Sequence, residues 1–179
     1  YVSAAGDHVG AADFPVAGDT QSWFYLSRVE VTTPAPASTI VVLGDSISDG
    51  TRSTPDTNNR WPDHLAKRLM AQSSGKMGVV NLGIAGNRVL SDGAGVSALA
   101  RFDRDVVAQP NATHVVFMEG INDVGLVRGG PRPKVDDLIA GHRQVIERAH
   151  ARGLKIYAAT LTPFEGVTIP NYWSEEGEA

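Results

Sequence analysis

Residues 42–51 read VLGDSISDGT, and this stretch decides the fold. The apolar run that begins at Thr39 stops abruptly at Gly44, Asp45 and Ser46. A continuous apolar run is typical of a strand buried on both faces, as in a parallel sheet. In open parallel sheets, ligands bind at the carboxyl ends of the strands. The stretch therefore predicts a buried strand that carries small polar residues to the ligand-binding edge of a sheet.

The same pattern returns along the chain, with helical patterns in between. Short apolar runs occupy residues 78–83 (GVVNLG), 113–118 (THVVFM) and 154–160 (LKIYAAT). Amphipathic stretches occupy residues 60–72, 96–109 and 135–153, and Gly153 is the expected C-cap of the last one. Strand and helix in alternation predict a doubly wound α/β sheet.

The first part of the chain has a different composition. Residues 1–31 are rich in Gly, Ala and Asp, and residues 23–31 (WFYLSRVEV) alternate apolar and polar positions, which predicts a strand. Two prolines in residues 32–38 (TTPAPAS) indicate an extended linker. We therefore expect residues 1–38 to be the tail of a β-rich N-terminal segment plus a linker.

Composition and charge exclude several classes of protein. The net charge is −4 and the 16 basic residues are scattered, so no nucleic-acid groove is indicated. No apolar stretch approaches the roughly 20 residues that span a bilayer. The absence of cysteine excludes disulfides, thiol catalysis and Cys-ligated zinc. No two of the five histidines have the spacing of a helical zinc motif, so no metal is expected.

Three strand ends are chemically distinctive. They read GDSISDG at residues 44–50, GIAGNRV at 83–89 and EGIND at 119–123. Because the carboxyl ends of parallel strands open onto the same edge, these segments are expected to lie together.

The first strand end has several interpretations. A phosphate-binding loop requires a lysine after Gly50, and an aspartyl phosphatase requires an aspartate where Ile47 stands. An acidic pocket built from Asp45 and Asp123 lacks the lysine expected after residues 154–160. A phosphate- or nucleotide-binding flavodoxin-like domain and a simple polar turn with a capping residue stay open.

A serine-based site accounts for all three strand ends. Ser46 would stand at the start of a helix, where its own amide can face a substrate oxygen. Gly86 would offer an amide with no side chain in the way, and the Asn122 carboxamide can donate to the same oxygen. Each of the last two is also typical of an ordinary turn.

The motifs GDSISDG, GIAGN and GIND resemble the first three sequence blocks of the SGNH hydrolases, the GDSL-type esterases and lipases. The resemblance runs from about Ile40 to Thr162. It implies a flavodoxin-like three-layer α/β/α sandwich and a serine ester hydrolase that needs no metal or organic cofactor. Ser46 would be the nucleophile, and the oxyanion hole would consist of Ser46, Gly86 and Asn122. Asp45 and Asp123 would support the loops.

The last block of this family, Asp-x-x-His, supplies the general base. No histidine of the sequence follows an aspartate by three residues. Residues 171–179 (NYWSEEGEA) have the pattern of a helix start at Ser174. We therefore expect the hydrolase domain of residues 39–179 to lack its last strand, its last helix and its Asp-x-x-His block, which a further C-terminal segment would supply.

The sequence also bears on the substrate and the location of the protein. Few bulky apolar residues flank the three loops, which favours short-chain or carbohydrate acetyl esters. The alternative is a non-catalytic acyl- or carbohydrate-binding module that keeps the pocket without the base. The resemblance and the composition favour a secreted or extracellular protein, although the chain does not begin with a signal peptide.

Overall fold

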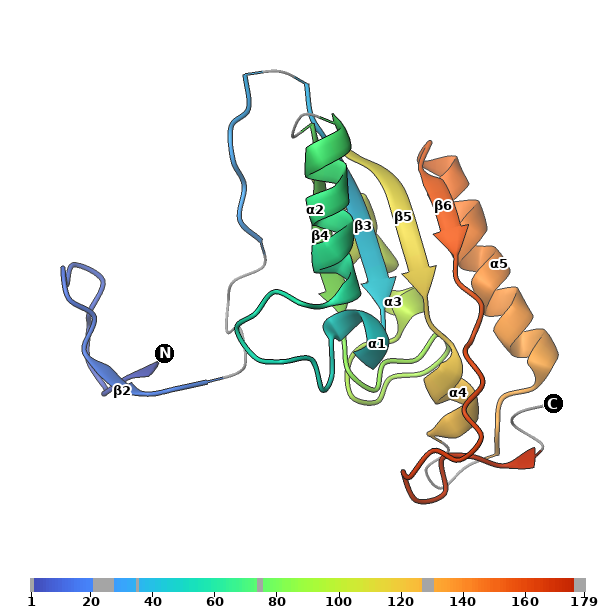
Figure 1. The fold of residues 1–179 in the computed structure, drawn as a ribbon. Coiled ribbons are helices and arrows are strands. Elements are labelled where there is room, and N and C mark those ends of the chain that lie inside the picture. The colour runs from blue at the N-terminus through green and yellow to red at the C-terminus, as the bar shows by residue number, and fades with distance from the viewer. Residues whose placement is uncertain (1, 21–27, 35, 74–75, 127–130, 176–179) are drawn as a thin grey trace. The chain divides into compact units, whose positions relative to one another are not determined.

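The computed structural model describes residues 2–20, 28–34, 36–73, 76–126 and 131–175 of the chain (Figure 1). The chain forms two compact units, Tyr1–Pro34 and Ala35–Ala179. The boundary predicted from the sequence, between residues 38 and 39, stays a prediction. The helix expected from Ser174 falls mainly on residues 176–179, outside the described residues.

The first unit contains a small antiparallel sheet. Its strands are β1 (Val2–Ser3) and β2 (Val16–Gly18). A short β-rich N-terminal segment is therefore confirmed, but at other residues than expected. The predicted strand at 23–31 falls partly on residues 21–27, which lie outside the described residues. Residues 28–31 form no strand, and Val29 and Val31 are each 79% exposed.

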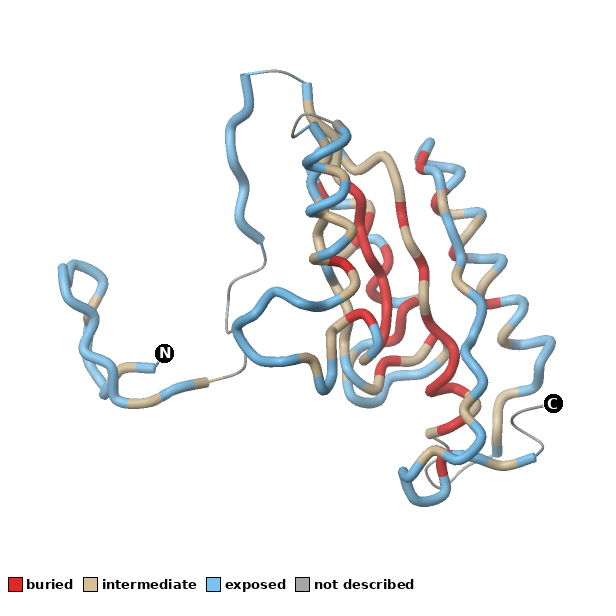
Figure 2. Tube along the Cα trace, viewed as in Figure 1, coloured by how far each residue is buried: buried red, intermediate tan, exposed pale blue. Residues whose placement is uncertain are grey.

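The second unit is built on a parallel sheet, as the apolar runs predict. Its strands are β3 (Ser38–Gly44), β4 (Met77–Gly83), β5 (Ala112–Met118) and β6 (Lys155–Ala158), in the order β4-β3-β5-β6. Figure 2 shows β3 buried along most of its length, between two neighbours. Gly44 lies in register with Gly83 and with Met118, so the three distinctive strand ends leave the sheet at one edge.

Helices cover both faces of this sheet, which confirms the three-layer sandwich. They are α1 (Ser46–Asp49), α2 (Trp61–Ser73), α3 (Ala98–Phe102), the π-type helix η1 (Asp103–Val107), α4 (Ile121–Gly125) and α5 (Val135–Ala151). In Figure 1, α2 lies in front of the sheet, and α3 and α5 lie behind it. None of the helices in the described ranges has both the length and the apolar character that a bilayer crossing requires.

The core explains why these segments are helical. On α5, Gly141, Val145 and Ala149 are buried at intervals of four residues, which places them on one face of the helix. Val145 and Ala149 belong to the same apolar cluster as Val41 of β3 and Phe102 of α3. The C-cap of α5 is Arg152, one residue before the predicted Gly153. Gly153 follows the cap with a φ of +71°, and its amide donates to the His150 carbonyl.

The predicted helix at 96–109 differs from expectation. It is regular only over α3 and widens into η1 directly after Phe102. A π-type turn of this kind often marks a functional region. The widening follows Arg101, whose buried side chain donates to the carbonyls of Leu82 and Gly44 at the ends of β4 and β3.

Candidate active site

Ser46 is the first residue of α1, directly after β3. Asp45 caps this one-turn helix by accepting a hydrogen bond from the Ile47 amide at 2.9 Å. The helix ends at Gly50, whose φ of +92° lies in the left-handed region. Ser46 is half-buried, and neither its hydroxyl nor its amide donates to another described residue. One hydroxyl and one amide are thus available at the same point.

Gly86 occupies a tight turn after β4. The Asn87 amide donates to the Ile84 carbonyl at 3.0 Å, and Gly86 has a φ of +78°. A Cβ atom at Gly86 would also lie 3.0 Å from Ala94 Cβ. Glycine is therefore required here, and its amide has no acceptor among the residues that the structure describes.

Asn122 lies on α4 and is 3% exposed. Its Nδ2 donates to the Asn87 carbonyl at 2.9 Å, and its Oδ1 accepts from the Tyr172 hydroxyl at 2.9 Å. A carboxamide nitrogen has two hydrogens, so one N–H remains for another acceptor. Through Asn87, the contact links the third strand end directly to the turn of Gly86.

Two hydrogen bonds join the strand end that carries Ser46 to the neighbouring strand end. The Ile84 amide donates to the Gly44 carbonyl at 2.9 Å, and Asn81 Nδ2 donates to the Ser48 carbonyl at 2.7 Å. Ser46, Gly86 and Asn122 thus come from three adjacent strand ends. Within the described ranges, no hydrogen bond links Ser46 to Gly86 or Asn122.

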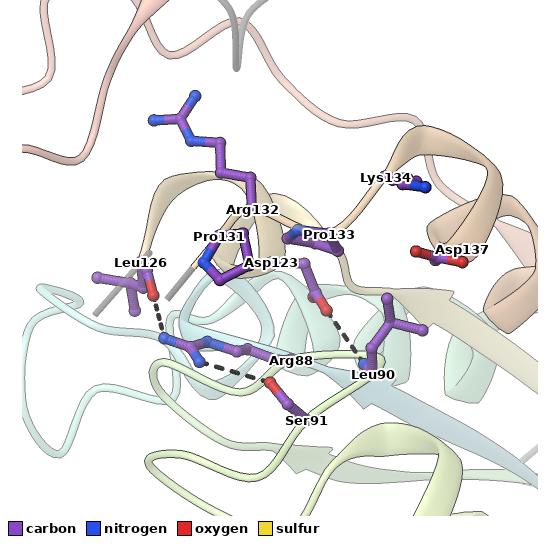
Figure 3. A pocket seen from close by; sticks show the side chains of 10 residues that line it. All are labelled: Arg88, Leu90, Ser91, Asp123, Leu126, Pro131, Arg132, Pro133, Lys134 and Asp137. Carbon is purple, nitrogen blue, oxygen red and sulfur yellow. Dashed lines mark hydrogen bonds between the residues drawn. The ribbon is translucent and has the colours of Figure 1, made fainter. Parts of the chain in front are cut away.

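The two predicted supporting carboxylates both hold backbone amides. Asp123 is 4% exposed and accepts from the Val89 amide at 2.8 Å. It also accepts from the Leu90 amide at 3.0 Å, a hydrogen bond drawn in Figure 3. Asp45 holds the Ile47 amide. Burial raises the pKa of both Asp45 and Asp123 above the ordinary value for aspartate. These contacts fix the loops that carry Ser46 and Gly86.

A buried arginine joins the strand ends, and the sequence analysis missed it. Arg101 is 1% exposed. Its guanidinium donates five hydrogen bonds of 2.7 to 3.2 Å. Two go to the backbone carbonyls of Leu82 (from Nη1) and Gly44 (from Nη2). The other three go to side chains: Asn87 Oδ1 (from Nε), Asp105 Oδ2 (from Nη1) and Glu119 Oε1 (from Nη2). These contacts use all five N–H groups of the guanidinium. The available signal was a charged residue inside the apolar pattern of 96–109.

The pKa values of the two carboxyl groups that accept hydrogen bonds from Arg101, those of Glu119 and Asp105, are shifted in opposite directions. Burial, and then the nearby charge of Asp45, raises the pKa of Glu119 to about 8. Burial also acts to raise the pKa of Asp105, but hydrogen bonds from Arg104 and Arg101 hold it below the ordinary value. Of the two acidic partners of Arg101, Asp105 therefore loses its proton more readily than Glu119.

Tyr172 is a second residue that the sequence analysis missed. It lies well beyond the end of β6 in the sequence. It is nevertheless only 6% exposed, and its hydroxyl contacts Asn122. Its ring packs edge-on against Phe164, with 5.7 Å between centroids. Burial, and then the charge of Asp45, raises the pKa of Tyr172 to about 12. No local pattern around residues 171–175 distinguishes this tyrosine.

No histidine in the described ranges contacts Ser46. His142, on α5, packs against Phe117 with 5.0 Å between ring centroids, and burial lowers its pKa. His64 Nε2 lies 2.7 Å from Asn59 Oδ1, and His114 stacks on Tyr157.

A cavity of about 480 Å³ adjoins the Asp123 loop (Figure 3). Its walls include Arg88, which donates to the Leu126 carbonyl and to Ser91 Oγ. Ser46, Gly86 and Asn122 do not line it. Among the described residues, no group of three His, Asp or Glu side chains has an arrangement that could hold a metal ion.

Fold and site together define an α/β sandwich with polar groups from three strand ends at one edge of its sheet. The chain belongs to the GDSL-like lipase/acylhydrolase family, whose model matches residues 42–178, and therefore to the SGNH hydrolases. No curated protein matches the chain by sequence.

Solved structures with a similar fold include those of AlinE4, TesA and a variant of Axe2. AlinE4, an SGNH-hydrolase family esterase, has a TM-score of 0.58 at 19% identity, covering 75% of this chain and 66% of that one. TesA has a TM-score of 0.55 at 28% identity, covering 73% and 65%. A variant of Axe2, an acetyl xylan esterase from Geobacillus stearothermophilus, has a TM-score of 0.56 at 25% identity, covering 80% and 67%. This chain thus spans about two thirds of the length of each, and the likeness to AlinE4 concerns the fold alone.

Proposed function

We propose that this protein is a serine ester hydrolase in which Ser46 forms a covalent acyl-enzyme. One observation carries the proposal: Asn122 keeps a free N–H while Asn87 and Tyr172 hold the rest of its carboxamide. Together with the unoccupied amides of Ser46 and Gly86, this gives three donors from three adjacent strand ends. Such a set suits an oxyanion that forms beside a serine hydroxyl.

The first half of the reaction forms the acyl-enzyme. Ser46 Oγ bonds to the acyl carbon and gives its proton to a histidine, while the carbonyl π electrons move to oxygen. The Ser46 amide, the Gly86 amide and Asn122 Nδ2 donate to that oxyanion. When the carbonyl re-forms, the bond between the acyl carbon and the alcohol oxygen breaks, and the histidine returns the proton to the departing alcohol.

The second half releases the acid. Water gives a proton to the histidine and bonds to the acyl carbon, and the same three donors stabilise the second oxyanion. The bond to Ser46 Oγ then breaks, and Ser46 recovers its proton from the histidine. Asp45 and Asp123 hold the loops throughout and exchange no proton with the substrate.

The histidine is proposed to belong to an Asp-x-x-His block in a further segment of the same protein. Two observations support this: the 179 residues contain no such block, and no histidine of the described ranges contacts Ser46. The length of the related structures, of which this chain covers 65 to 67%, leaves room for such a segment.

The proposed substrates are short-chain esters or acetyl esters of carbohydrates. The similarity to Axe2, named an acetyl xylan esterase, supports this at 25% identity. Turnover of nitrophenyl acetate, nitrophenyl octanoate and acetylated xylan tests the proposal. Faster turnover of octanoate than of acetate would contradict the short-chain assignment.

The nucleophile is tested by Ser46→Ala in the natural protein, with Ser53→Ala as the matched control. Removal of the attacking oxygen is expected to lower kcat/KM for nitrophenyl acetate at least about a thousandfold. The control is expected to match wild type. Equal turnover by Ser46→Ala and wild type would favour the alternative, a non-catalytic acyl- or carbohydrate-binding module.

A further inference from the structure

The hydroxyl of Tyr172 is buried against one atom of the proposed site. It lies 2.9 Å from Asn122 Oδ1, and the tyrosine is 6% exposed. A carboxamide oxygen can only accept, so the phenol is the donor in this hydrogen bond. The phenol keeps its proton over the whole working range of an enzyme, because burial raises its pKa to about 12.

The Asn122 carboxamide is consequently held at both ends. Tyr172 holds its oxygen, and the Asn87 carbonyl accepts one of its two N–H groups at 2.9 Å. These two contacts determine the plane of the group and leave the second N–H at one defined position. Without the phenol, Oδ1 would be a buried acceptor with no donor, and rotation of the carboxamide toward another donor would displace the free N–H.

The Tyr172 ring packs against α4 at the position of a glycine. A Cβ atom at Gly125 would lie 2.5 Å from the Cε1 and Cζ atoms of the ring, so the ring packs directly on the helix backbone. Gly125 follows Asn122 by three residues on the same short helix. Phe164 also meets the ring edge-on, and the Tyr172 amide donates to the Ile169 carbonyl at 3.1 Å.

We propose that Tyr172 is a positioning residue of the oxyanion hole, which aims the free N–H of Asn122 at the carbonyl oxygen of a bound ester. The proposal rests on the proposed function. Tyr172 touches Asn122 and not the reacting atoms, so its effect must pass through Asn122.

Two variants of the natural protein disturb this contact from opposite sides. Tyr172→Phe removes the donor and keeps the ring, whereas Gly125→Ala keeps the donor and displaces the ring. Each is expected to lower kcat for nitrophenyl acetate by roughly tenfold, less than the loss of a whole oxyanion donor, with KM within about twofold. Tyr157→Phe is the matched control, because Tyr157 is 58% exposed on β6, and it is expected to leave kcat unchanged.

A double-mutant cycle separates positioning from a general structural role. In an Asn122→Ala background, Tyr172→Phe is expected to cause no further loss of kcat, because its only route to the reaction is gone. An equal loss in both backgrounds would overturn the proposal, as would an unchanged kcat in Tyr172→Phe alone. In either case, Ser46-dependent turnover would leave the proposed function standing. Wild-type turnover in Ser46→Ala would remove the proposed function and this inference together.

Discussion

At the scale of single residues, Arg101 has an unusual concentration of contacts. Its guanidinium reaches the Gly44 carbonyl before Ser46, the Asn87 side chain after Gly86, and Glu119 before Asn122. One buried cation thus contacts all three strand ends of the site. A planar fork of five donors can do this, whereas the single ammonium group of lysine cannot.

We predict that Arg101→Lys lowers the free energy of unfolding by about 3 kcal/mol, because it leaves buried acceptors of the network without donors. Urea unfolding followed by circular dichroism measures this difference. Arg104→Lys is the matched control: Arg104 is three residues further along the chain, its side chain is 62% exposed, and a change within about 0.5 kcal/mol is expected. Equal effects of the two substitutions would show that Arg101 has no special role in stability.

At the scale of elements, the close packing of α1 on the end of β4 depends on Gly83. A Cβ atom at Gly83 would lie 2.3 Å from the Asp49 amide nitrogen and 2.8 Å from the Ser48 carbonyl carbon. Both are backbone atoms of the helix that begins at Ser46. They cannot move aside as a flexible side chain can, so the position of Ser46 depends on the missing side chain of Gly83.

We expect Gly83→Ala to lower the free energy of unfolding by about 2 to 3 kcal/mol, because α1 must move away from β4. Gly78→Ala, also on β4, is the matched control, since a Cβ atom there meets nothing within 4 Å. It is expected to change stability by less than about 1 kcal/mol. Thermal unfolding of the two variants measures the contrast, and an unaltered midpoint in Gly83→Ala would contradict the packing described here.

At the scale of the whole molecule, the fold gathers three acidic side chains at one sheet edge. Asp45, Glu119 and Asp123 are all less than 5% exposed, and burial raises the pKa of each. A carboxyl group whose pKa is higher in the folded state binds a proton more tightly there than in the unfolded chain. Its stabilising contribution is complete at low pH and is lost as the pH rises.

For Glu119 the window runs from its ordinary pKa of 4.5 to about 8. We predict that between pH 5 and 7.5 the free energy of unfolding of wild type falls more steeply than that of Glu119→Gln, by up to about 1.4 kcal/mol per pH unit. Urea unfolding at several pH values measures the two slopes. Glu147→Gln, an exposed substitution on α5, is the control and should follow wild type. Parallel slopes for wild type and Glu119→Gln would contradict the raised pKa.

The fold was largely predictable because its signals are local. Each buried strand is an uninterrupted apolar run, and the residues that follow it in sequence must emerge at the strand end. The strand predicted at 23–31 was wrong for residues 28–31, because alternation alone does not supply a neighbouring strand to cover Val29 and Val31. The helix of 96–109 was predicted as regular, since no local signal marks the widening at η1.

The sequence by itself determined the parallel sheet and the identity of the residues at its three polar ends, because both follow from the order of apolar and polar residues along short segments. Only the tertiary structure decided what surrounds those ends. Arg101 contacts Gly44 across 57 positions, and Tyr172 contacts Asn122 across 50. A hydrogen bond between such distant residues is strengthened by burial, and both the burial and the relative positions of donor and acceptor exist only once the chain has folded.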